Sequence, residues 1–202
     1  MGIHSTAKVK IIKGRSEMEL TDYSGPYKHE LKFEDFSKDF LIKLMHSWQR
    51  AYMRLSAIWY QTVMDKFGME AADSCNLEVW LTVGEKVVPK FAKIGNVEPK
   101  TVLDALKIVQ LAPDSHVGSE LFAGELDIKS ENHVITSTTK CAPLEFFEKA
   151  APERMEYFCH VLEKQVMEKY FNNPKIKVTP LKLPPRKGPD DICCQFEIKL
   201  EE

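Results

Sequence analysis

The sequence has no long apolar run, and this excludes a helical membrane architecture at once. No stretch approaches the roughly 18 consecutive apolar residues that a membrane-spanning helix needs. The opening residues, MGIHSTAKVKIIKG, also lack the apolar segment of a signal peptide. We therefore expect a cytoplasmic protein with no membrane partner.

An excess of charge of one sign is also missing. The 28 basic and 30 acidic residues nearly cancel, so no strong field attracts nucleic acid or anionic lipid. Basic residues concentrate only at 175–187, without clustered aromatic side chains on which bases could stack. We expect no nucleic-acid partner, and we interpret these lysines as protection of an edge strand against pairing with other chains.

The motifs of the commonest enzyme classes are absent too. There is no phosphate-binding glycine loop, no dinucleotide fingerprint, no serine nucleophile elbow and no HExxH zinc motif. Asp114, Ser115 and His116 have the residue types of a catalytic triad, but three consecutive residues cannot adopt its geometry. Any chemistry must therefore come from residues that are distant in the sequence.

Among the features that are present, two kinds of periodicity follow one another along the chain. Helical spacing extends over 35–111, with a break expected at Gly84 or Pro89. Strand-like alternation begins near 119, turns at 130–132, and is followed by two helical segments and two further strands. This order predicts an α+β fold, in which long N-terminal helices pack with an antiparallel sheet made of a hairpin, a helix and two strands.

One hydrophobic core suits a chain of 202 residues of which 44% are hydrophobic. We expect residues 1–30 to form a flexible arm and 31–202 to form a single α+β domain. Within that domain the helical half covers 35–111, and the half made of the sheet and its helix covers 117–202.

The first long helix carries apolar residues at alternating spacings of four and three, which predicts a broad buried face. The residues of this stripe are Leu41, Met45, Trp48, Tyr52, Leu55, Trp59 and Thr62. Trp48, Tyr52 and Trp59 could instead line a ligand pocket between packed elements. Arg50 and Arg54, one turn apart, could then hold a ligand carboxylate, although exposed arginines usually only solvate a helix.

Five cysteines in a cytoplasmic chain are expected to be reduced thiols. In the last strand, DDICCQFEIKL, alternation places Cys194 on the apolar face with Phe196 and Ile198, and Cys193 on the polar face. A helix across the sheet could bring Cys141, Cys159 and Cys194 together. Three thiolates with one open position suit zinc or another divalent metal, whereas packing as small hydrophobic residues is the commoner role of buried cysteine.

The segment CHVLEK adds two groups that could move protons. Cys159 and Glu163 lie four residues apart and so project from adjacent helical turns. Glu163 could serve as a general base or metal ligand and His160 as a proton shuttle. The alternative is an ordinary solvated helix flank.

The segments TTKCAPLEFFEK and CHVLEKQVMEKYFNNPKIKVTPLKLPPRKGPDDICCQFEI carry a family resemblance. They resemble the C-terminal half of the L-2-amino-thiazoline-4-carboxylic acid hydrolase-like family, and more distantly the 4-vinyl reductase-like small-molecule-binding domains. The resemblance covers roughly residue 33 to the C-terminus. It implies a compact α+β ligand-binding domain that forms a homodimer through its long helices, and in the hydrolase branch the opening of a small ring that contains sulfur and nitrogen.

Three functions therefore remain open, of which the last is a structural partner protein whose long helices mediate assembly. The first is a metal- or thiol-assisted hydrolase that acts on a cyclic amidine, with Glu163 and His160 as catalytic residues and Cys141, Cys159 and Cys194 as metal ligands or thiols. The second is a non-catalytic module that binds a small molecule or metal as a sensor or carrier.

Overall fold

The computed structural model describes residues 19–114 and 121–201. The chain forms two compact units, Met1–Met45 and His46–Glu202. Most of the arm predicted over 1–30 lies outside the described residues.

The first unit contains one short turn and the start of a long helix. The 3₁₀ turn η1 covers Phe33–Asp35, and an isolated backbone bridge joins Leu20 to Phe36. Ser37 accepts a hydrogen bond from the backbone N–H of Phe40 (3.2 Å), as a helix N-cap does. The long helix therefore begins at Lys38, just after the start of the helical segment predicted from residue 35.

Four helices make up the first half of the described fold, as the helical periodicity predicted. They are α1 (Lys38–Phe67), α2 (Met69–Lys86), α3 (Val88–Gly95) and α4 (Val102–Gln110). Gly68 separates α1 from α2 with φ of 87°, a left-handed conformation that glycine adopts without strain. Pro89 lies in the first turn of α3, so the expected break in the second helical segment is confirmed.

The second half contains a four-stranded antiparallel sheet and the helices between its strands. The strands are β1 (Phe122–Ser130), β2 (His133–Cys141), β3 (Ile176–Lys182) and β4 (Cys194–Leu200), in the order β1-β2-β4-β3. Between β2 and β3 lie α5 (Ala142–Ala150), the turn η2 (Pro152–Arg154), the π-helical turn η3 (Glu156–Leu162) and α6 (Glu163–Tyr170). The predicted α+β class is thus confirmed, and the lysine-bearing β3 is an edge strand.

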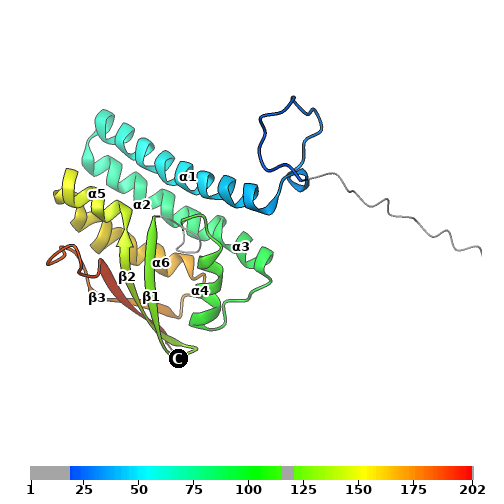
Figure 1. Ribbon diagram of the computed structural model, residues 1–202. Coiled ribbons are helices and arrows are strands. Elements are labelled where there is room, and N and C mark those ends of the chain that lie inside the picture. Colours follow the sequence, from blue (N-terminus) through cyan, green and yellow to red (C-terminus); the bar gives the residue numbers. More distant parts are fainter. Residues whose placement is uncertain (1–18, 115–120, 202) are drawn as a thin grey trace, which may run out of the picture. The chain divides into compact units, whose positions relative to one another are not determined.

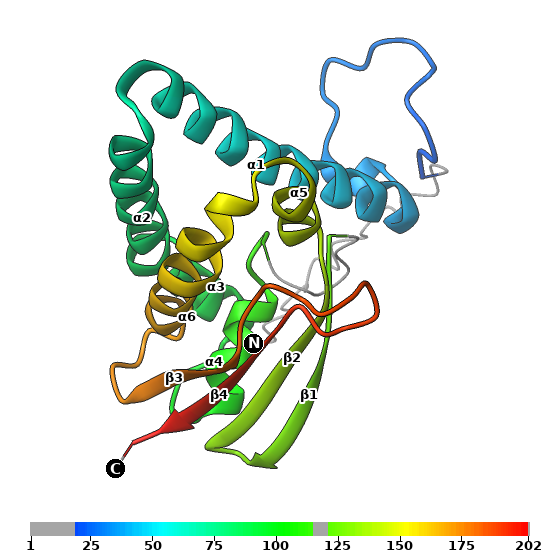
Figure 2. The ribbon, with the colours of Figure 1, turned by 90° about the vertical axis from the view of Figure 1, so that its left-hand side faces the viewer.

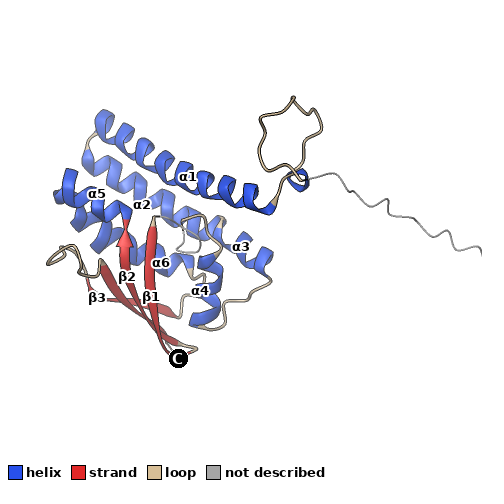
Figure 3. Cartoon of the chain, viewed as in Figure 1, coloured by secondary structure: helices blue, strands red, loops and turns tan. Residues whose placement is uncertain are grey.

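The main core lies between one face of the sheet and two helices. In Figures 1 and 2, α4 and α6 lie on the same side of the sheet. Figure 3 shows the strands gathered in one layer and the helices of this half on one side of them. The buried cluster joins Val102 and Ala105 of α4 to strand residues such as Val134, Val178 and Ile198. Burial of this apolar face holds the sheet against the helices.

A second cluster packs the helices on one another. Its buried members include Trp80, Ile108, Leu162 and Tyr170. Gly84 of α2 allows close approach to α6, since a Cβ there would lie 2.9 Å from Cγ of Lys169. This contact brings α2 against the helix that carries Glu163.

The predicted buried face of the first long helix is wrong. In α1 the expected broad buried face is not buried: Leu55 is 66% exposed, and Tyr60 is the one buried residue among those of the helix. In α2 the buried residues are Ala72, Asn76, Trp80 and Gly84, whereas Cys75 is exposed. The large Trp80 and the close contact at Gly84 determine which side of α2 faces α6.

Candidate functional site

The three predicted site cysteines lie where β2, β4 and the following helix converge. Cys141 is the last residue of β2, and Cys194 is the first residue of β4 and contacts the main core. Thr138 pairs with Cys194 across the two strands, and the backbone N–H of Cys193 donates to the Thr138 carbonyl oxygen (2.7 Å). Cys159 comes from the π-helical turn.

This π-helical turn positions Cys159 and His160 and leads directly into Glu163. A π-helical turn has i→i+5 hydrogen bonds and displaces the side chains that follow it, and such turns occur frequently at functional sites. The amphipathic pattern of the segment predicted a regular helix here. No residue type marks a π turn, so the sequence offered no signal for it.

The predicted acid–base residue Glu163 is electrostatically unusual. Its side chain is exposed, yet desolvation by the surrounding protein, with the Asp114 charge as the smaller contribution, raises its pKa to about 7 from 4.5. Both contributions favour the protonated form, so the upward direction is consistent.

Asp114 is a site residue that the sequence reasoning missed. Its Oδ2 accepts a hydrogen bond from the Tyr170 hydroxyl (2.8 Å), and its buried Oδ1 has no hydrogen-bond partner among residues 19–114 and 121–201. Burial raises the pKa of Asp114, and burial together with Asp114 raises the pKa of Tyr52 to about 12. The sequence marks Asp114 only as part of a triad-like tripeptide, whose Ser115 and His116 lie outside the described residues.

The thiols are neutral at physiological pH. Burial raises the pKa of Cys159 and Cys194 to about 12, and it raises that of Cys141 as well. The charge of Glu163 acts on all three thiols in the same direction. Since a reactive thiolate needs a lowered pKa, this environment does not activate a cysteine nucleophile.

The arrangement of these thiols does not by itself make a metal centre. Cys194 lies within electrostatic range of both Cys141 and Cys159. Within 19–114 and 121–201, however, no three histidine, cysteine, aspartate or glutamate side chains form a group that could hold a metal ion. The donor set does not fit a metal as it stands, and zinc stays a prediction.

The prediction for Cys193 is wrong. Strand alternation predicted that Cys193 lies on the polar face of the last strand, but its side chain is buried, with 1% exposure. Because β4 begins only at Cys194, the alternation of the strand does not extend to Cys193. Burial raises the pKa of the Cys193 thiol, and nearby Arg186 opposes that shift.

The other predicted site residues are dispersed. A ring nitrogen of His160 lies 3.0 Å from the carbonyl oxygen of Pro184, which fixes the ring against a loop. On α1, Trp59 is half-buried, and Tyr52 packs edge-on against Trp80 with ring centroids 6.0 Å apart. The other predicted pocket residues of α1, Trp48, Arg50 and Arg54, are exposed. Of the predicted pocket residues on α1, Tyr52 is the one that the structure links to Asp114.

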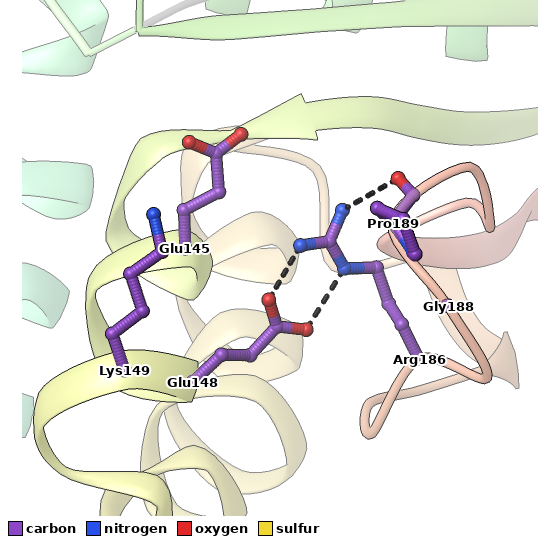
Figure 4. A pocket seen from close by; sticks show the side chains of 6 residues that line it. All are labelled: Glu145, Glu148, Lys149, Arg186, Gly188 and Pro189. Atoms are coloured by element: carbon purple, nitrogen blue, oxygen red, sulfur yellow. Dashed lines mark hydrogen bonds and ion pairs between the residues drawn. The ribbon is translucent and has the colours of Figure 1, made fainter.

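A recess of about 480 Å³, lined mostly by charged residues, lies between α5 and the loop that follows β3 (Figure 4). Arg186 of that loop forms a two-pronged ion pair with Glu148 of α5, which lowers the pKa of the Glu148 carboxyl. This recess was not predicted. Its charged lining residues are dispersed in the sequence and showed no motif.

None of the described helices combines the length and the apolar character that crossing a membrane requires. No known protein family matches the sequence, and neither a characterised protein nor a solved structure matches the chain. The structure therefore supports the α+β class, while the resemblance to the hydrolase-like family remains a prediction.

Proposed function

We propose that the protein binds a small molecule beside Glu163 and that Glu163 exchanges a proton with it. The observation that carries this proposal is the raised pKa of Glu163, about 7, next to the neutral thiols of Cys141, Cys159 and Cys194. A group whose pKa lies near the working pH can act both as a base and as an acid. Protonation shifts of this kind concentrate at functional sites.

A cyclic amidine suits this environment. Glu163 and Asp114 are two carboxyl groups whose pKa values are both raised, so a cationic ligand would favour their ionised forms. Within the part of the chain that the structure describes, Oδ1 of Asp114 has no hydrogen-bond partner, so this acceptor is left for a ligand N–H. The neutral thiols provide a soft, weakly polar wall for a ring that contains sulfur.

In a hydrolase, Glu163 would act twice in one turnover. Its carboxylate would take a proton from a water molecule whose oxygen bonds to the amidine carbon. The resulting carboxylic acid would return a proton to the ring nitrogen as the bond between that nitrogen and carbon breaks. His160, bound to the Pro184 carbonyl, would exchange protons with solvent.

The alternative function is a non-catalytic binding module, and turnover separates the two. The test incubates the protein with 2-aminothiazoline and follows binding by calorimetry and ring opening by NMR. The enzyme hypothesis is supported if the wild type hydrolyses the ring and the rate falls at least tenfold in Glu163→Gln but not in the matched Glu156→Gln. Saturable binding without ring opening supports the binding module. If the wild type does not bind the compound at all, both hypotheses are refuted.

The hypothesis of a metal-assisted reaction predicts different results. Stoichiometric zinc in protein purified without chelators, and the loss of this zinc in Cys141→Ser, would support a metal site. Full activity and stability of metal-free protein would refute the metal site. We favour proton transfer by Glu163 because no described group of side chains is arranged as a metal site.

We further propose that an exposed face of α1 mediates homodimerisation. Ala51, Leu55, Ile58 and Thr62 follow one another at spacings of four, three and four, and all four are exposed. Such spacing is typical of a helix-pairing seam. In an antiparallel pair centred near Leu55, the small Ala51 would face the large Ile58 of a second copy, and two-fold symmetry would repeat this contact.

A further inference from the structure

The recess between α5 and the loop after β3 has the size of a small-molecule site. Its volume of about 480 Å³ lies within the range of ligand pockets, roughly 300–1,000 Å³. The residues that line it are Glu145, Glu148, Lys149, Arg186, Gly188 and Pro189. It lies outside the Glu163 site, and none of these residues has a role in the function proposed above.

Arg186 is held in a fixed orientation at the wall of this recess. Its side chain is 11% exposed. Nε donates to Oε1 of Glu148 (2.8 Å), Nη2 donates to Oε2 of the same carboxylate, and Nη1 donates to the carbonyl oxygen of Pro189 (3.3 Å). The guanidinium therefore needs little further ordering to bind a ligand, and this lowers the entropic cost of binding.

Two donors of Arg186 remain for a ligand. A guanidinium carries five N–H groups, and the three hydrogen bonds above use one on each nitrogen. One N–H on Nη1 and one on Nη2 are left, and these form the outer edge of the group. Figure 4 shows this edge turned away from Glu148 and toward the side of the recess that carries Glu145. Two parallel N–H groups match the two oxygens of a carboxylate.

Glu145 provides the opposite charge across the recess. Its carboxylate raises the pKa of Arg186, as a smaller effect than those of Glu148 and Cys193, so the two charges interact. Among the ion pairs of the described residues, Arg186 is paired with Glu148 and not with Glu145. The space between Arg186 and Glu145 thus separates unlike charges that do not touch. Lys149 adds a cation on the α5 side.

We propose that this recess binds an amino-acid-type zwitterion. The ligand carboxylate accepts two hydrogen bonds from the outer edge of Arg186, and the ligand ammonium donates to Glu145. A ligand with both charges neutralises the separated pair of the recess without adding net charge. A ligand with only an anionic or only a cationic end would leave one wall uncompensated and desolvated.

The test measures binding of free L-amino acids to the full chain by saturation-transfer NMR, first as a mixture of the twenty and then singly. The expected result is saturable binding that weakens at least tenfold when the carboxylate is amidated, and equally when the amine is acetylated. Glu145→Gln should weaken binding at least tenfold. Glu153→Gln, which removes the same charge from the exposed residue Glu153 outside the recess, should not.

Arg186→Lys keeps the positive charge but loses the two-pronged geometry, and it should weaken binding at least tenfold as well. Arg186→Lys could unfold because Glu148 loses its partner. In that case the double variant Arg186→Gln with Glu148→Gln, which removes both charges together, is measured in place of Arg186→Lys. The proposal is overturned if no amino acid binds at 10 mM. It is equally overturned if the amide binds as tightly as the acid, or if Glu145→Gln binds as tightly as Glu153→Gln.

Discussion

The protonation state of Glu163 is coupled to its protein surroundings and to three neighbouring thiols. The like charge of Asp114 and the surrounding protein both oppose ionisation of its carboxyl. The same carboxylate charge raises the pKa of the three neighbouring thiols, so that one residue links the protonation of the entire cluster. Coupled groups of this kind titrate together, and a ligand that binds one of them perturbs the others.

The raised pKa of Glu163 predicts a specific dependence of stability on pH. A carboxyl whose folded-state pKa lies above its unfolded value of 4.5 binds more protons in the folded state. Its stabilising contribution is therefore fully present below pH 4.5 and is lost as pH rises through about 7. The free energy of unfolding, measured with urea from pH 4 to 8, should fall more steeply in wild type than in Glu163→Gln.

The comparison with Glu156→Gln makes this measurement specific. Glu156 is an exposed carboxyl in the adjoining π-helical turn, so its loss should leave the slope of wild type unchanged. Parallel pH profiles of wild type and Glu163→Gln would show that Glu163 has an ordinary pKa. The proton-transfer role proposed for it would then lose its basis.

The five cysteines should differ sharply in reactivity. Cys75 is exposed, whereas Cys193 is buried and Cys141, Cys159 and Cys194 are neutral thiols of raised pKa. Because the thiolate is the reactive form, iodoacetamide at pH 7.5 should modify Cys75 first and the others at least tenfold more slowly. Peptide mass spectrometry over time measures each rate. Rapid labelling of Cys194 would instead indicate an activated thiol and favour thiol-assisted chemistry.

At the scale of elements, Arg154 attaches the helices to one another. Its buried guanidinium lies 4.1 Å from the ring centroid of Tyr60 in α1, and its Nη2 donates to Oδ1 of Asp73 in α2 (3.1 Å). The Tyr60 hydroxyl donates to the same carboxylate oxygen (2.5 Å). A single residue of the turn η2 thus contacts both long helices.

Breaking this ion pair should be costly and asymmetric. Arg154→Met leaves the partly exposed Asp73 free to hydrate, and we expect a loss of about 2 kcal/mol, below the ~3–5 kcal/mol of a fully buried pair. Asp73→Asn leaves the buried arginine charge without its counter-ion and should cost about 3 kcal/mol. Urea unfolding of both variants and of the double variant yields their coupling energy. Unchanged stability in Asp73→Asn would contradict the pairing.

The exposed seam of α1 predicts a change of oligomeric state. Leu55→Asp places a charge at its centre and should convert a dimer to a monomer, measured by light scattering during gel filtration. Ala57→Asp introduces the same charge on another exposed position of α1, away from the seam, and should leave the dimer intact. A wild-type monomer at 100 µM would refute the homodimer, and dissociation by both variants would mean that the seam is not the interface.

Most elements of this fold could be predicted from the sequence, because local signals specify them. Helical spacing predicted the helices, and alternation predicted the strands, including the apolar face on which Phe196 and Ile198 are buried. The buried sides of the helices were less predictable. Asn76 and Gly84 lie on the buried side of α2, although neither has an apolar side chain. The close contact between Gly84 and α6 determines that this side is the buried one.

The candidate site was predictable only in part, for a related reason. Cys141, Cys159, Cys194 and Glu163 could be grouped in advance, because strand alternation and helical spacing indicate shared faces. Asp114 could not be, since its position depends on how the chain after α4 returns toward Tyr170. Residues of such connections are brought to a site by tertiary packing, and no local pattern marks them.

At the scale of the whole molecule, two hydrophobic clusters share their boundary. Val109 of α4 packs against both of them. Tyr170 belongs to the helical cluster, and the next residue, Phe171, belongs to the sheet cluster. Since adjacent residues serve both clusters, loosening one should loosen the other. The clusters should therefore unfold together as one cooperative unit.

The placement of tryptophan allows a direct test of this cooperativity. All three tryptophans, Trp48, Trp59 and Trp80, lie in α1 and α2, so fluorescence reports on the helices alone. Ile198→Val removes one methylene from the sheet core, where Ile198 is fully buried, and should cost about 1 kcal/mol. The matched Ile128→Val makes the same change at a position of β1 that is 54% exposed, and should cost less than about 0.5 kcal/mol.

If the two clusters unfold together, Ile198→Val shifts the urea midpoint of tryptophan fluorescence as far as that of far-ultraviolet circular dichroism, although no tryptophan lies in the sheet. A fluorescence midpoint that stays at the wild-type value while the dichroism curve splits into two steps would show independent halves. The expected single α+β domain over 31–202 would then be wrong. Glu163 would in that case belong to a half that can open without disturbing the helices, and its proton exchange would be coupled to that local opening.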